Sequence, residues 1–276
     1  MRNLRYYTII IGLCTIGLVG CTSTPTHETS NNSAEYNSCL QAGPQAPRDI
    51  DQLQGTNPVL FSTAPDYTQM NLCNIHFHEN TEHRARAYPI PAKAKPGIGG
   101  YQCIMSKRLT AAELSLPERV ACDDIQPGDT IEVHWVHSSC TVTPGPTLGA
   151  CLSKSCANPN LRVESQAFTL VNDPNAINFA DLDTADSTIN GYYQAKAIPN
   201  NTGKPVEFLG STTGPKYNNH NSCSPYQVTW SVRPDCAKLD INSLHKWCEQ
   251  NAFDEDHPHG SRLLVTDPAL LSDIPK

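Results

Sequence analysis

Short runs in which apolar and polar residues alternate dominate the chain from about residue 39 onward. The clearest are NLCNIHFH (71–78), TIEVHWVH (130–137), LRVESQAFTLV (161–171), PVEFLG (205–210) and YQVTWSVRP (226–234). A period of two is that of a β-strand with two different faces. Proline and glycine interrupt these runs throughout, with 22 and 16 residues respectively. The pattern therefore predicts a mainly β domain.

Helical periodicity is rare. The segment DINSLHKWCEQN (240–251) predicts a helix, since Asp240 or Asn242 can cap it and Leu244, Trp247 and Cys248 share a face. A second, weaker helix is predicted at TAAELSLPER (110–119).

The N-terminus has the features of an export signal. Arg2 and Arg5 precede the apolar run 6–20, which ends in LVG before Cys21. This order is similar to a bacterial lipoprotein signal, cleaved before a cysteine that then carries lipid. We expect a signal peptide at 1–20, a polar lipidated tether at 21–38 and one catalytic domain at 39–276. The predicted location is the periplasmic face of the cell envelope, with the outer membrane as the default.

The cysteine content agrees with export. After loss of Cys14 and lipidation of Cys21, ten of the twelve cysteines remain. An even number scattered along an exported chain predicts disulfides rather than a thiolate zinc site. The net charge of -7 and the lack of a basic run argue against a nucleic-acid partner.

Histidines on two of the predicted strands indicate a metal site. His76 and His78 would point to one side of their strand, and His134 follows two residues after Glu132 on another. Three neutral imidazoles with a fourth position open are typical of a catalytic zinc centre. Glu132 is expected to accept the second N–H of His134, and Asn74 that of His76.

Five segments in this order, NLCNIHFHENTEH, EVHWVHSSC, LRVESQAF, FLGSTTGP and CSPYQVTWSVRPDC, resemble the delta-class carbonic anhydrases, and more distantly the alpha class. The resemblance implies one alpha-carbonic-anhydrase-like domain built on a large, mostly antiparallel sheet with a few short helices. It also implies reversible hydration of carbon dioxide to bicarbonate by zinc-bound hydroxide, with cobalt or cadmium as substitute ions.

The resemblance also assigns roles to residues. It makes His76, His78 and His134 the metal ligands. Glu132 would hydrogen-bond to a ligand rather than to the metal. Thr212 would orient the hydroxide and pass its own proton toward Glu82. The apolar pocket for carbon dioxide would be walled by four residues: Val136, Val163, Val228 and Trp230.

Two other functions remain open. HFHENTE also fits the HxHxxxE motif of cupin metalloenzymes, and a lipoprotein that binds zinc without catalysis needs the same imidazoles.

We expect His83 and His137 to be structural histidines, and DEDHPHG (254–260) to be a solvated loop rather than a second divalent-ion site. A proton-shuttle histidine is not assigned: His83, His220 and His245 are the candidates.

Overall fold

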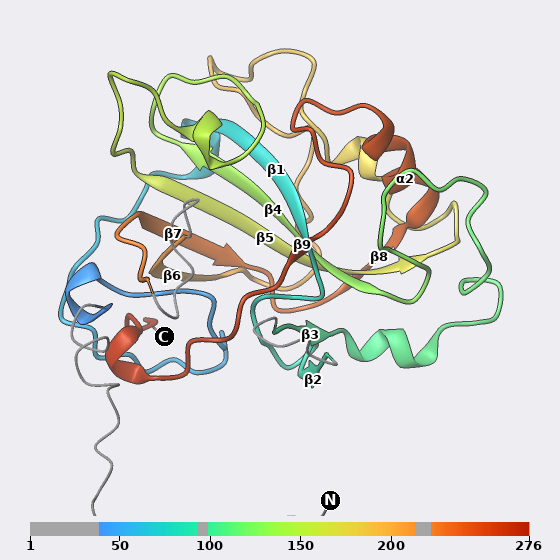
Figure 1. The fold of residues 1–276 in the computed structure, drawn as a ribbon, viewed down its shortest axis with the longest axis horizontal. Helices are drawn as coiled ribbons and strands as arrows, with labels where there is room; N and C mark the ends of the chain where they lie inside the picture. The colour runs from blue at the N-terminus through green and yellow to red at the C-terminus, as the bar shows by residue number, and fades with distance from the viewer. Residues whose placement is uncertain (1–38, 93–98, 213–221, 276) are drawn as a thin grey trace, which may run out of the picture. The chain divides into compact units, whose positions relative to one another are not determined.

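The computed structural model describes residues 39–92, 99–212 and 222–275, all of which belong to one structural unit. Its main feature is a seven-stranded sheet in the order β6-β7-β5-β4-β1-β9, with β8 also paired to β5 (Figure 1). The strands are β1 (Asn71–Glu79), β4 (Thr130–Ser138), β5 (Leu161–Val171), β6 (Val206–Ser211), β7 (Gln227–Val232), β8 (Ala237–Asp240) and β9 (His259–Gly260). A two-stranded sheet joins β2 (Ile90–Pro91) to β3 (Tyr101–Gln102).

The sheet is mixed. β1–β4, β4–β5 and β6–β7 pair antiparallel, whereas β1–β9, β5–β7 and β5–β8 pair parallel. The prediction of a mainly β domain with one large sheet is confirmed, but parallel pairings are as numerous as antiparallel ones. They arise because β7, β8 and β9 return to β5 and β1 through long connections, which alternation within one strand does not reveal.

One predicted helix is confirmed and the other is wrong. α2 spans Ile241–Glu249, and the Asp240 carboxylate caps it by accepting from the amides of Asn242 and Ser243. The segment 110–119 forms only a turn, in which Glu113 accepts from the amide and hydroxyl of Thr110. Pro117 then prevents the turn from continuing. Residues 39–42 are also helical. The 3-10 helices are short: η1 (Tyr67–Gln69), η2 (Ile104–Arg108), η3 (Leu148–Cys151), η4 (Phe179–Asp181) and η5 (Pro268–Leu270).

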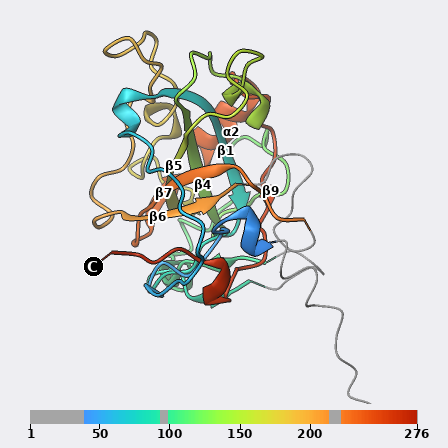
Figure 2. The ribbon, with the colours of Figure 1, turned by 90° about the vertical axis from the view of Figure 1, so that its left-hand side faces the viewer.

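Alternation along the strands divides the buried side chains between two clusters. Ile75 and Phe77 of β1 belong to the cluster that also contains Trp247 of α2, the helix behind β1 in Figure 2. The ring centroids of Phe77 and Trp247 lie 6.4 Å apart. Val136 and Val163 belong to the second cluster, on the other face. His76 and His78 have the opposite parity to Ile75 and Phe77, so the core on one face fixes the direction of the histidines on the other.

All ten cysteines of the 39–276 segment are paired, as predicted for an exported chain. The bonds are Cys39–Cys223, Cys73–Cys151, Cys103–Cys236, Cys122–Cys248 and Cys140–Cys156. Cys73 lies at the irregularity where β1 shifts its register against β4 between Leu72 and Asn74. Its bond to Cys151 ties the strand of His76 and His78 to η3.

None of the helices in the described part of the chain has the length and apolar character needed to cross a membrane. The expected signal peptide, the tether and Cys21 lie outside the described residues.

Candidate metal centre

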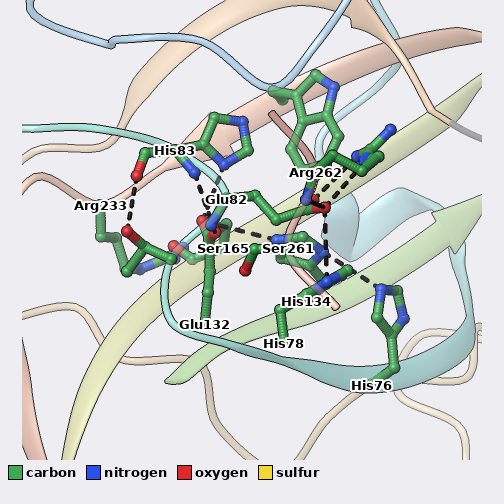
Figure 3. Close-up of polar contacts among 12 residues, drawn as sticks. His76, His78, Glu82, His83, Glu132, His134, Ser165, Arg233, Ser261 and Arg262 are labelled. Carbon is green, nitrogen blue, oxygen red and sulfur yellow. Dashed lines mark hydrogen bonds and ion pairs between the residues drawn. The ribbon is translucent and has the colours of Figure 1, made fainter. Parts of the chain in front are cut away.

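Three predicted ligands come together on adjacent strands. His76 pairs directly with His134 across the β1–β4 ladder, and His78 pairs with Glu132. The ring centroids of His76, His78 and His134 lie 4.8 to 5.1 Å from one another. His134 is buried, whereas His76 is partly exposed, and both line the same cavity. Figure 3 shows the side chains of all three histidines.

One distance indicates a shared ion. His76 Nε2 and His134 Nδ1 face each other at 3.3 Å. Two nitrogens bound to one tetrahedral zinc at 2.0–2.1 Å lie about 3.4 Å apart. If the second ring nitrogen of each histidine carries the proton, two lone pairs meet at this point. The chemistry of the donor set and this spacing fit a divalent metal.

Two of the three second ring nitrogens face an acceptor at hydrogen-bond distance. His76 Nδ1 lies 2.6 Å from Asn74 Oδ1, the contact expected from strand parity, and His78 Nδ1 lies 3.4 Å from the Gly260 carbonyl oxygen. The expected hydrogen bond from His134 to Glu132 is not formed, since His134 Nε2 lies 3.6 Å from Glu132 Oε1 and has no hydrogen-bond partner. Such acceptors set the tautomer and direct the free lone pair toward a metal.

His76 and His78 are neutral at pH 7, which is the form that binds metal. Burial, reinforced by the imidazoles of His134 and His259, lowers the pKa of His78 to about 3, despite the opposing charge of Glu82. Burial and the neighbouring imidazoles also hold the pKa of His76 well below its ordinary value.

Glu132 supports several groups at once. Its carboxylate accepts from His83 Nδ1 at 2.9 Å, from the amides of Glu82 and His83, and from the Ser165 hydroxyl (Figure 3). Burial would raise the pKa of Glu132, but the imidazoles of His83 and His134 hold it well below its usual range. His83 is therefore a buried structural histidine, as expected.

Glu82 has a partner that the sequence did not reveal. Both of its oxygens accept from Arg262, at 2.8 Å from Nε and 2.9 Å from Nη2, and the Glu82 side chain is fully buried. Among the hydrogen bonds of the described residues, none joins Glu82 to Thr212. The expected Thr212–Glu82 contact is thus absent, because the guanidinium fork occupies the carboxylate.

The cavity beside the histidines has a volume of about 350 Å³. Val136 and Thr212 line it, together with Thr147 and Leu148, which the sequence analysis did not single out. The other expected pocket residues, Val163, Val228 and Trp230, do not line it. They lie in the buried cluster beneath, where the Trp230 ring meets the His134 ring edge-on at 5.2 Å.

His259 also lines this cavity, which contradicts the expectation of a solvated loop for DEDHPHG. Its strand β9 pairs parallel with β1, placing His259 opposite His78. Its ring stacks on His76 at 5.0 Å, and Glu255 Oε2 lies 3.0 Å from its Nε2. The hydrogen bond to Glu255 raises the pKa of His259.

The candidate shuttle histidines are not placed at this cavity. His83 is fully buried against Glu132, and His245 is buried and accepts from the amides of Ala121 and Cys122. His220 lies outside the described residues.

A larger cavity of about 750 Å³ opens near Arg162, Glu164 and Arg233. Arg162 and Glu164 have the opposite strand parity to Ser165, which bonds to Glu132 on the side of the histidines. Since no histidine lines the larger cavity, it is not the metal centre.

His137 lies on the opposite side of β4 from His134, as strand parity predicts. It is fully buried, its Nδ1 lies 3.0 Å from the Trp135 carbonyl oxygen, and its ring lies 5.5 Å from that of Tyr67. Burial lowers the pKa of His137 to about 3. His137 is therefore a neutral structural histidine at pH 7.

We predict that His137 makes the protein acid-sensitive. Its pKa is about 3 folded and about 6.5 unfolded, so the unfolded chain binds the extra proton between these values. Above pH 6.5 this group does not change the free energy of unfolding, which then falls as the pH is lowered toward 3, by about 5 kcal/mol in total. Urea unfolding of wild type and His137→Asn from pH 7 to 4 measures this. A stability difference that is independent of pH would contradict it.

Comparison with known proteins identifies the family. The family model for delta carbonic anhydrases matches residues 67–243, while no curated protein sequence matches the chain. Similar solved structures include a hyperthermostable carbonic anhydrase from an active hydrothermal vent chimney, with 15% identity, a TM-score of 0.34 and coverage of 88% of this chain and 91% of that one. An alpha-carbonic anhydrase from Thermovibrio ammonificans, in complex with the inhibitor sulfanilamide, has 16% identity, a TM-score of 0.29 and coverage of 85% and 88%. The Photobacterium profundum alpha-carbonic anhydrase has 17% identity, a TM-score of 0.27 and coverage of 87% and 97%.

The structural likenesses are distant, but the family match includes the segments that hold His76, His78 and His134 and covers well over half of the 276 residues. The chain belongs to the delta carbonic anhydrase family.

Proposed function

We propose that this carbonic anhydrase uses Zn²⁺, held by His76, His78 and His134, to hydrate carbon dioxide to bicarbonate. The observation that carries the assignment of ligands is the 3.3 Å approach of His76 Nε2 to His134 Nδ1. When bound, zinc lowers the pKa of a coordinated water to about 7 and so supplies hydroxide at neutral pH. Cobalt or cadmium would fit the same imidazoles.

The chain's own residues have three tasks in this proposal. Asn74 and the Gly260 carbonyl fix the tautomers of His76 and His78. Val136 and Leu148 give the cavity an apolar wall suited to carbon dioxide, which is small and nonpolar. Thr212 lines the same cavity and would orient the attacking oxygen.

The cupin alternative is disfavoured by Glu82. In HFHENTE this glutamate would be the carboxylate ligand, yet both of its oxygens accept from Arg262. The alternative of a zinc-binding protein without catalysis has the same imidazole set and is separated by turnover.

Stopped-flow hydration of carbon dioxide tests the function. The metal-free, zinc-loaded and cobalt-loaded protein are compared after metal analysis, with the disulfides intact. We expect turnover only with bound metal. Stoichiometric zinc without turnover would favour a binding protein, and failure to bind zinc would reject the metal centre.

Thr212→Ala should keep full zinc occupancy and slow hydration by about 10- to 100-fold, since loss of an orienting group commonly costs this much. Thr212→Ser, which retains the hydroxyl, is the control and should recover most of the rate. Equal rates for wild type and Thr212→Ala would remove Thr212 from the mechanism.

We also propose that residues 1–20 are a cleaved signal and that lipid on Cys21 anchors the protein to the cell envelope. The motivation is the sequence LVGC after a basic and apolar N-terminus. Palmitate labelling of wild type but not of Cys21→Ser would support it, and labelling of both would refute it.

A further inference from the structure

His259 differs from an ordinary surface histidine in its surroundings. The donor atoms of His76, His78 and His259 lie within 4.8 Å of one another, as do those of His78, Glu82 and His134. His78 is common to both groups, so His259 adjoins the proposed zinc ligands. It enters from β9, more than 100 residues beyond His134 in the sequence.

The position of β9 is fixed by contacts of the three residues that follow His259. Gly260 accepts from His78, the Ser261 hydroxyl donates to the carbonyl of Glu79, and Arg262 binds Glu82. The imidazole therefore lies beside His76 because its backbone is held there, and not because a free loop folds over the cavity.

The hydrogen bonding of His259 matches that of two of the proposed ligands. One ring nitrogen of His76 faces the Asn74 side-chain oxygen, and one ring nitrogen of His78 faces the Gly260 carbonyl oxygen. In His259 the same part is played by Glu255, whose oxygen lies 3.0 Å from Nε2. Metal-binding histidines commonly donate their second ring N–H to a carboxylate.

Glu255 is itself held in place. It is only 7% exposed, its amide donates to Asn251 Oδ1, and its carbonyl accepts from Asn251 Nδ2. With Nε2 directed to this carboxylate, the lone pair of Nδ1 remains available. The neighbouring His257 provides a contrast, since its side chain is 62% exposed and pairs with the exposed Asp256.

We propose that His259 is a displaceable fourth ligand of the metal that His76, His78 and His134 hold. This inference rests on the proposed metal centre and extends it. The donor atoms of His259, His76 and His78 lie within 4.8 Å of one another and must approach to about 3.4 Å to share a tetrahedral ion, so the His259 ring must move toward the centre in order to bind. Because the His259 side chain is 42% exposed, its ring has room for that movement.

As a fourth ligand, His259 would compete reversibly with external ligands for the metal. While His259 binds, the ion has four imidazole ligands and no position for water or an anion. An external ligand must displace it, so the apparent affinity falls in proportion to the fraction of protein in the open form. A protein closed nine-tenths of the time binds such a ligand about tenfold more weakly than the same protein locked open.

Cobalt-loaded protein tests the ligand set, because the visible absorption of Co²⁺ changes when an oxygen ligand replaces a nitrogen. His259→Ala should change this spectrum, bind azide about tenfold more tightly and release zinc to a chelator about 10- to 100-fold faster. His257→Ala is the matched control and should equal wild type in all three measurements. Glu255→Gln should move azide affinity and zinc release in the same direction as His259→Ala, by a smaller factor.

The results separate this inference from the proposed function. If His259→Ala and wild type have the same cobalt spectrum, azide affinity and zinc release, His259 is not a ligand, although the three-histidine centre stands. If wild type binds no metal, the proposed function fails first. Should His259→Ala not fold, His259→Gln, which keeps a polar side chain of similar reach, replaces it under the same criteria.

Discussion

His134→Ala should abolish both zinc binding and hydration of carbon dioxide. The side chain is buried and supplies the one imidazole contributed by β4, 3.3 Å from His76 Nε2. Two remaining imidazoles leave the geometry of the ion undefined. The loss of zinc affinity should exceed the roughly 10- to 100-fold loss that follows removal of a residue that only hydrogen-bonds to a metal ligand. Competition with a chelator and stopped-flow hydration measure the two effects.

His137→Ala is the control for this result, because it removes an imidazole three positions away on the other face of the same strand. It should lower stability while the folded protein keeps zinc and turnover. If His137→Ala lost zinc and His134→Ala retained it, the assignment of the metal centre to this face of β4 would be wrong.

Arg262→Met should destabilise the metal-free protein by about 3 to 5 kcal/mol. The substitution leaves the Glu82 carboxylate buried without its bidentate partner, whereas the pair now satisfies both of its oxygens. Burial would raise the pKa of Glu82, and the Arg262 charge is the main group that holds it well below its usual range. Urea unfolding at pH 7 gives the change in free energy.

Two controls make this prediction specific. Arg119 pairs with Glu249, but both side chains are largely exposed, so Arg119→Met should cost less than about 1 kcal/mol. Arg262→Met combined with Glu82→Gln should recover part of the loss, because the uncompensated charge is gone. Equal effects of Arg262→Met and Arg119→Met would show that the buried pair has no special role.

Alternation along the chain was enough to predict the strands that carry the centre. Strand parity placed His76 and His78 on one face of their strand, opposite Ile75 and Phe77, and it also anticipated the contact of Asn74 with His76. His134, rather than His137, was expected beside them because it shares a face with Glu132. These features depend on one strand or on a pair of adjacent strands, where a period of two fixes direction.

What the sequence did not reveal comes from distant parts of the chain. β9 is only two residues long, lies in a segment broken by proline and has no period from which to predict it. Its parallel pairing with β1 nevertheless brings His259 and Arg262 to the centre. The family resemblance implied that Val163, Val228 and Trp230 wall the cavity, but a resemblance between motifs does not fix how deep a side chain lies, and these three lie beneath the cavity.

The Cys73–Cys151 bond has a consequence for biogenesis. It joins the strand of His76 and His78 to η3, and Leu148 of η3 forms part of the cavity wall. A newly made chain in a reducing compartment has the histidines but no covalent tie between them and this wall. We therefore expect the Cys73–Cys151 disulfide to form before Leu148 takes its fixed position beside the metal site. Recombinant protein made in a reducing cytosol would then need reoxidation before its hydration rate describes the native enzyme.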